Sequence, residues 1–70
     1  MKIWNEAVRM IVLHPDGGGK LEVMAHTMLD ARLQAAQHWN LPGEQTKRCK
    51  ILVEKSALDK CREVNIGGSP

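Results

Sequence analysis

The chain has 70 residues, a net charge of +2 and only two aromatic residues, Trp4 and Trp39. A chain of this length forms one small domain, whose core alone supplies a net stability of only roughly 3–5 kcal/mol. The mild positive charge does not by itself imply nucleic-acid binding, and the scarcity of aromatic rings argues against sites that stack bases on them.

The cysteine content and the hydropathy of the sequence indicate the cellular location of the protein. The two cysteines, Cys49 and Cys61, are too few for the disulfide framework that is usual in a secreted domain of this size. Polar residues interrupt the N-terminal segment, which therefore does not resemble a signal peptide, and no apolar run approaches the ~20 residues of a membrane span. We expect a cytoplasmic protein that does not contact a membrane.

A β-hairpin is predicted near the N-terminus. Residues Glu6–Leu13 are rich in apolar and branched residues, and a His-Pro pair follows them, which favours a first strand. Residues 14–20 contain a proline and three consecutive glycines, which predict a turn. Apolar and polar residues then alternate from Lys20 to Ala25, the pattern of a half-buried second strand.

A helix over residues 28–39 is the clearest predicted element. Thr27 is suited to cap its first turn and Asn40 to end it in a left-handed conformation. After a polar loop over residues 44–47, the segment Arg48–Glu54 predicts a third strand. Residues 57–63 predict a short terminal helix, and residues 65–70 a flexible C-terminal tail.

Together these elements predict one α+β domain over residues 1–64, with the element order β-β-α-β-α. If the third strand lies beside the first, all neighbouring strands are antiparallel and the sheet order is second, first, third. The helix then covers one face of this three-stranded sheet. The predicted core residues on that face are Val8, Met10, Val12, Leu21, Val23, Ala25, Cys49, Ile51 and Val53.

The opposite face of the predicted sheet is more apolar than an ordinary solvent face. It has an apolar centre and a charged rim formed by Arg9, Glu22, Lys50 and Glu54, which is typical of an interaction surface. The helix also has an apolar arc of roughly 200°, wider than the ~100° that one packing face requires. The expected interaction surface comprises Arg9, Ile11, Leu13, Met24, Arg32, Leu33, Trp39 and Leu52. The alternative is that a small domain exposes some apolar side chains without any partner.

No motif predicts catalysis, a cofactor or a metal. The segment Gly17–Lys20 lacks the first glycine and the final Ser or Thr of a phosphate-binding loop. Zinc sites pair their ligands at short spacing, whereas the histidines and cysteines of this chain lie at least eleven residues apart. We therefore expect neither an enzyme nor a cofactor, and a small metal-binding protein is kept only as an alternative.

The expected function is a non-catalytic protein–protein interaction module, of accessory or inhibitor type, that self-associates as a homodimer and has a further, unknown protein partner. Its size resembles that of phage or mobile-element accessory proteins, which is an analogy only. The alternative is sequence-nonspecific nucleic-acid binding through the stretch from Lys47 to Arg62, which holds six basic and two acidic residues. Its phosphate contacts would be Lys47, Arg48, Lys50, Lys55, Lys60 and Arg62.

Overall fold

The computed structural model describes residues 1–64, so the tail predicted over residues 65–70 lies outside the described residues. The sheet has the order β2-β1-β3, and β4 pairs with the beginning of β1. All of these pairs are antiparallel. The predicted α+β class, strand order and main helix are confirmed. The elements are β1 (Lys2–Leu13), β2 (Lys20–Thr27), α1 (Met28–Trp39), α2 (Gly43–Thr46), β3 (Lys50–Val53), α3 (Lys55–Leu58) and β4 (Arg62–Glu63).

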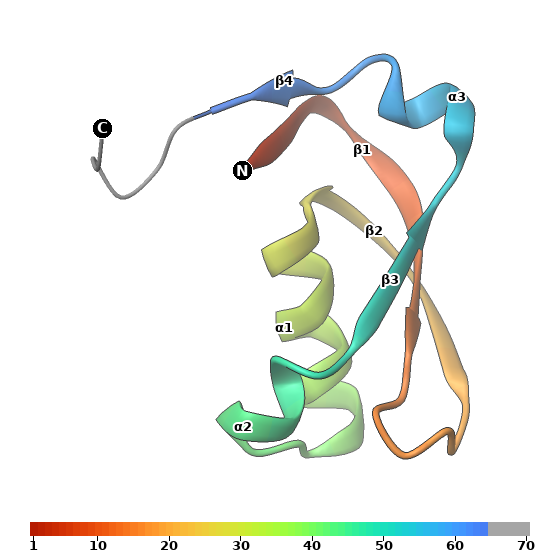
Figure 1. The fold of residues 1–70 in the computed structure, drawn as a ribbon, viewed down its shortest axis with the longest axis vertical. Coiled ribbons are helices and arrows are strands. Elements are labelled where there is room, and N and C mark those ends of the chain that lie inside the picture. Colours follow the sequence, from red (N-terminus) through yellow and green to blue (C-terminus); the bar gives the residue numbers. More distant parts are fainter. Residues whose placement is uncertain (65–70) are drawn as a thin grey trace.

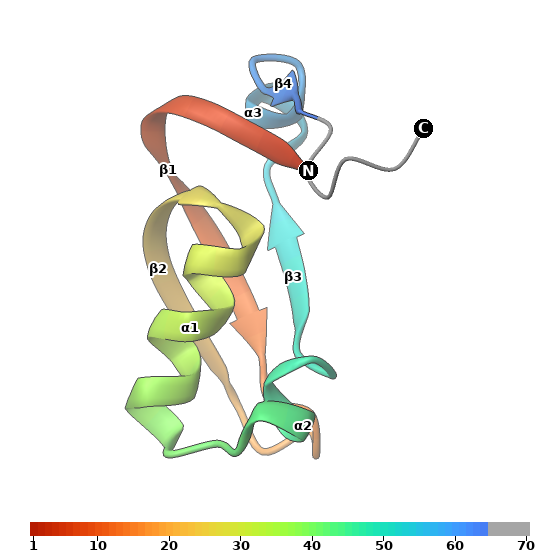
Figure 2. The ribbon, with the colours of Figure 1, turned by 90° about the vertical axis from the view of Figure 1, so that its left-hand side faces the viewer.

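The domain has two layers (Figure 1). One layer is the sheet, and the other consists of α1 and α2, which lie on the same side of it (Figures 1 and 2). The short elements α3 and β4 lie at the end of the sheet where β1 begins. None of the described elements covers the other side of β1, β2 and β3, which is therefore open to solvent (Figure 1).

The turn between β1 and β2 is short and closed by backbone hydrogen bonds. The amide of His14 donates to the carbonyl of Gly19 at 2.9 Å, and the amide of Gly17 donates to the carbonyl of His14 at 3.0 Å. Gly17 and Gly19 have φ angles of 76° and 145°, a region that L side chains rarely adopt. The glycine run thus allows the chain to reverse between the two strands.

Helix α1 has the bounds and caps that the sequence predicts. The hydroxyl oxygen of Thr27 accepts a hydrogen bond from the amide of Asp30 at 3.0 Å. At the other end, Asn40 adopts the left-handed conformation with φ 56°, and its amide donates to the carbonyl of Ala36. Ala31 and Ala35 are fully buried on the face of α1 that packs on the sheet, where their small side chains permit close approach.

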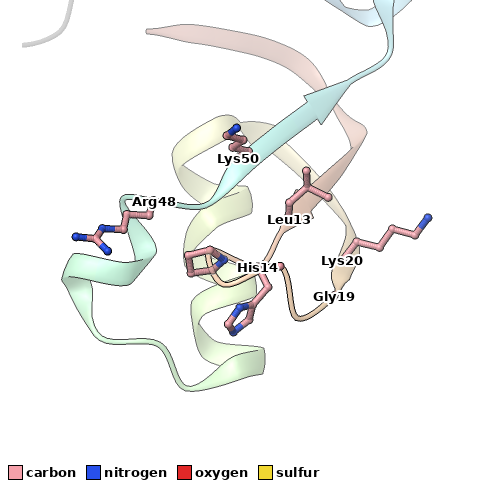
Figure 3. Close-up of a pocket in the computed structure, with 8 residues that line it drawn as sticks. Leu13, His14, Gly19, Lys20, Arg48 and Lys50 are labelled. Atoms are coloured by element: carbon pink, nitrogen blue, oxygen red, sulfur yellow. The ribbon is translucent and has the colours of Figure 1, made fainter.

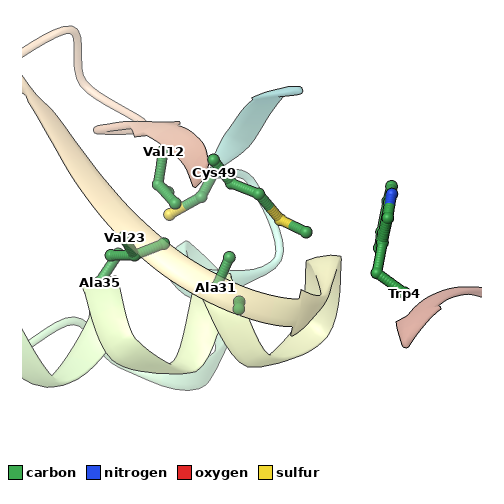
Figure 4. Packing of buried hydrophobic residues seen from close by; sticks show 8 residues of the cluster. Trp4, Val12, Val23, Ala31, Ala35 and Cys49 are labelled. Atoms are coloured by element: carbon green, nitrogen blue, oxygen red, sulfur yellow. The ribbon is translucent and has the colours of Figure 1, made fainter. Parts of the chain in front are cut away.

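The predicted core face of the sheet is confirmed. Of its nine residues, five are buried and the other four are partly buried against them. The alternation of side chains along a strand places these residues on the same face, toward α1. The buried cluster consists of Trp4, Met10, Val12, Val23, Ala25, Ala31, Ala35 and Cys49 (Figure 4).

Trp4, which was not predicted in the core, is only 2% exposed and lies beyond Ala31 at one end of the cluster (Figure 4). Strand β1 begins at Lys2 rather than Glu6, and its register with β2 shifts between Ile3 and Val8. Such an irregularity bends a strand. The first part of β1 still pairs with β2 through Ile3 and Thr27, and it also pairs with β4.

The C-terminal part of the domain differs from the sequence-based expectation. The terminal helix spans Lys55–Leu58 rather than residues 57–63, and β4 follows it. Two long-range contacts account for this: the indole Nε1 of Trp4 donates to the carbonyl of Ala57 at 2.6 Å, and Ile3 pairs with Arg62. The single helical turn α2 spans Gly43–Thr46, where a polar loop over residues 44–47 was expected.

Strand β2 is an outer strand of the sheet. An outer strand presents backbone groups that have no neighbouring strand to bind them. The side-chain amide of Gln34 on α1 donates to the carbonyl of Met24 at 2.9 Å and to the carboxylate of Asp30 at 3.2 Å. One carbonyl of β2 is thus bound by the chain's own helix.

Candidate interaction surface

The uncovered side of the sheet has a regular arrangement set by the strand register. Partners across β1 and β2 are Arg9 with Met24, Ile11 with Glu22, and Leu13 with Lys20. Partners across β1 and β3 are Ile11 with Leu52 and Leu13 with Lys50. Directly opposed residues of antiparallel strands share a face. We define the open face as Arg9, Ile11, Leu13, Lys20, Glu22, Met24, Lys50, Leu52 and Glu54.

The centre of the open face is apolar. Met24 and Leu52, on the outer strands β2 and β3, are 56% and 55% exposed, and Ile11 and Leu13 on the central strand β1 are half-buried. Neighbouring residues in these strands, such as Met10 and Val53, point toward α1 and belong to the core. Since strand geometry sends alternate side chains to opposite faces, Met24 and Leu52 cannot turn inward without disrupting the core.

Charged residues flank this apolar centre. The guanidinium of Arg9 donates a hydrogen bond to the carboxylate of Glu54, and it lies 4.0 Å from the carboxylate of Glu22. The hydrogen bond and charge of Glu54, and then the charge of Glu22, raise the pKa of Arg9 above its ordinary value. All three side chains are more than half exposed, so these ion pairs contribute little to folding stability. They place the guanidinium of Arg9 next to both carboxylates.

A second apolar surface lies on α1, away from the sheet. Leu29 and Leu33 are 47% and 49% exposed. Together with Leu41 and Pro42, they line a shallow groove between α1 and α2. Helix α1 therefore packs on the sheet with one stripe of residues and leaves its second apolar stripe in solvent, as the width of its apolar arc indicates.

Two residues of the expected interaction surface, Arg32 and Trp39, contact other parts of their own chain and are only partly exposed to solvent. The Nε atom of Arg32 donates to the carbonyl of Cys49 at 3.3 Å, at the start of β3. The ring of Trp39 packs edge-on against His14, with centroids 4.9 Å apart, and also contacts the core. The structure thus brings five of the eight predicted residues together on the open face, namely Arg9, Ile11, Leu13, Met24 and Leu52, and places Leu33 in the groove.

Of the charged residues of the open face, Glu22, Lys50 and Glu54 were expected at its rim, whereas Lys20 was not predicted there. The alternation of β2 places Lys20 and Glu22 on this face, because both lie an even number of residues from Met24 and therefore point to the same side of the sheet. Glu54 lies beyond the end of β3, and its contact with Arg9 identifies its position.

The basic residues do not gather at one place. Lys47 and Arg48 lie near α2, whereas Lys55, Lys60 and Arg62 lie near α3 and β4 at the opposite end of the domain (Figure 1). A hollow at the β1–β2 turn is lined by basic residues, including Lys20, Arg48 and Lys50. The side chains of Lys20 and Arg48 extend to opposite sides of it, so they do not converge on one anion (Figure 3).

Nothing within residues 1–64 forms a cluster of three or more His, Cys, Asp or Glu side chains around a common point for a metal ion. Cys49 is buried, and its thiol donates to the carbonyl of Gln45 at 3.6 Å. Cys61 is half-buried, and its thiol donates to the carbonyl of Leu58 at 2.9 Å. Neither thiol is in a disulfide.

Within residues 1–64, no helix has the length and apolar character needed to span a membrane.

Comparison of the chain with protein-family models, with curated proteins and with solved structures finds no match.

Proposed function

We propose that the protein is a non-catalytic interaction module that forms a homodimer by stacking the open faces of two copies. The observation that carries this proposal is the apolar centre of the open face, where Met24 and Leu52 are each more than half exposed beside Ile11. A contiguous apolar centre within a charged rim is the usual composition of a protein–protein interface. The further protein partner and the cytoplasmic location stay predictions.

A second copy is a suitable occupant because the open face carries both kinds of charge. Glu22 and Glu54 are acidic, whereas Arg9, Lys20 and Lys50 are basic. The acidic residues of one face can therefore pair with the basic residues of an identical face, and no partner of a different composition is needed. Sheets that pack face to face through apolar centres are also a common way to complete a core in small β-containing domains.

The size of the face sets the expected strength of the dimer. Three strands at ~4.8 Å spacing and the six paired residues of β1 from Val8 to Leu13 give about 14 Å by 20 Å, on the order of 300 Å² per subunit. A standard stable interface buries about 800 Å² per partner. We therefore expect a reversible dimer that dissociates on dilution.

Sedimentation equilibrium over a roughly hundredfold concentration range tests the proposal. The wild-type chain is expected to shift from monomer to dimer. Leu52→Lys should remain monomeric because it places a charge at the apolar centre. Leu33→Lys is the matched control, since Leu33 has a similar exposed fraction but lies on α1.

A wild-type chain that stays monomeric at all concentrations would refute the proposal. A dimer that is lost in Leu33→Lys and kept in Leu52→Lys would also refute it, and would place the interface in the groove between α1 and α2. Circular dichroism of each variant verifies that the fold is intact.

A further inference from the structure

The charges of the open face are separated along the strands, and this separation specifies how two copies stack. At one end of the face, Glu54 and Arg9 lie side by side, with Glu22 4.0 Å from Arg9. At the other end, Lys20 and Lys50 flank Leu13. The first group carries one net negative charge and the second carries two positive charges.

Two simple two-fold arrangements can stack such faces. If the axis runs along the strands, each end of the face meets the same end of its partner, so lysines oppose lysines. If the axis runs across the strands, each end meets the opposite end, and Glu54 of one copy approaches Lys50 of the other. Like charges that oppose each other across an interface are destabilising, and opposite charges are favourable.

We infer that the dimer has its two-fold axis across the strands, so that Glu54 of each subunit pairs with Lys50 of the other. This inference rests on the proposed function, since it specifies the partner and orientation at the same face. Stacked sheets lie about 10 Å apart, a gap that the long side chains of Lys and Glu can bridge at the rim. The apolar centres around Ile11 and Leu52 then face each other.

Neither Lys50 nor Glu54 packs in the core, so substitutions that reverse their charges should leave the fold intact. Lys50 is exposed, and the side chain of Glu54 is 55% exposed. Lys50→Glu and Glu54→Lys should each weaken the dimer roughly tenfold or more, because each places two pairs of like charges in the symmetric interface. The double variant Lys50→Glu/Glu54→Lys, and an equimolar mixture of the two single variants, should restore the dimer.

Lys60→Glu is the control, because it makes the same change in net charge as Lys50→Glu but lies between α3 and β4. Its dimer should weaken less than that of Lys50→Glu. Glu54→Lys also removes the hydrogen bond from Arg9, and the double variant does not restore that bond. Recovery in the double variant therefore reports the contact between subunits.

Salt provides an independent measurement. If opposite charges meet, raising the ionic strength from low to physiological values should weaken the wild-type dimer, whereas it should strengthen a dimer in which lysines oppose each other. A wild-type dimer that Leu52→Lys abolishes, but that shows no recovery in the double variant, would overturn the orientation and leave the proposed function standing. A wild-type chain that stays monomeric would refute both the orientation and the proposed function.

Discussion

Trp4→Phe is expected to destabilise the domain and loosen its C-terminal segment. Trp4 is 2% exposed, and its indole donates to the carbonyl of Ala57 at 2.6 Å. Phenylalanine preserves most of the apolar contact but has no hydrogen-bond donor. The carbonyl of Ala57 then loses its bond to the chain's N-terminal strand, and a small void replaces part of the indole.

The lost hydrogen bond costs about 1 kcal/mol. The void adds about 1–2 kcal/mol, by comparison with other truncations of buried side chains. The sum is about 2–3 kcal/mol, against a total of roughly 3–5 kcal/mol for a domain of this length. With a slope of about 1 kcal/mol per molar urea, which is usual for so small a chain, the unfolding midpoint should fall by about 2–3 M.

Urea unfolding followed by circular dichroism measures the midpoint, and limited trypsin digestion measures the local effect. Trypsin sites at Lys55, Lys60 and Arg62 lie in the segment that Trp4 holds. Cleavage there should be faster in Trp4→Phe than in the control Trp39→Phe, whose ring is only partly buried. An unchanged midpoint together with unchanged cleavage in Trp4→Phe would show that this contact does not hold the segment.

Three smaller effects follow from local geometry. Thr27→Ala removes the cap of α1 and should lower the free energy of unfolding by about 1 kcal/mol in the same urea assay; an unchanged midpoint would mean that the cap is dispensable. Asn40→Ala should cost about 1 kcal/mol because φ is 56° there, whereas Asn40→Gly should cost less; the reverse order would contradict the left-handed cap. A thiol reagent should modify half-buried Cys61 faster than Cys49, which is 2% exposed, and faster modification of Cys49 would contradict its burial.

Most of the sheet and α1 could be predicted because their determinants are local. Thr27 and Asn40 mark the ends of α1, and the alternation of β2 sets which side chains face the core. The open face follows from the same alternation, so Met24 and Leu52 could be placed on it from the sequence. No contact between distant segments was needed for these assignments.

The remaining features depend on contacts between residues that are distant in sequence. The polar residues Asn5 and Glu6 interrupt the apolar pattern, so the first part of β1 and the burial of Trp4 give no periodic signal. Strand β4 is defined by its pairing with the beginning of β1, almost the whole chain away. Likewise, a helical projection places Arg32 between two apolar stripes but does not show that the carbonyl of Cys49 lies within its reach.

The hydrogen bond from Gln34 to the carbonyl of Met24 has a consequence for the pairing of a further strand with β2. An incoming strand that tried to extend the sheet beside β2 would first have to displace this side chain. The hydrogen bond therefore disfavours edge-to-edge pairing of many copies into one continuous sheet at β2. The proposed stacking through a two-fold axis, in contrast, would bury the open face of both subunits, so assembly would stop at a dimer.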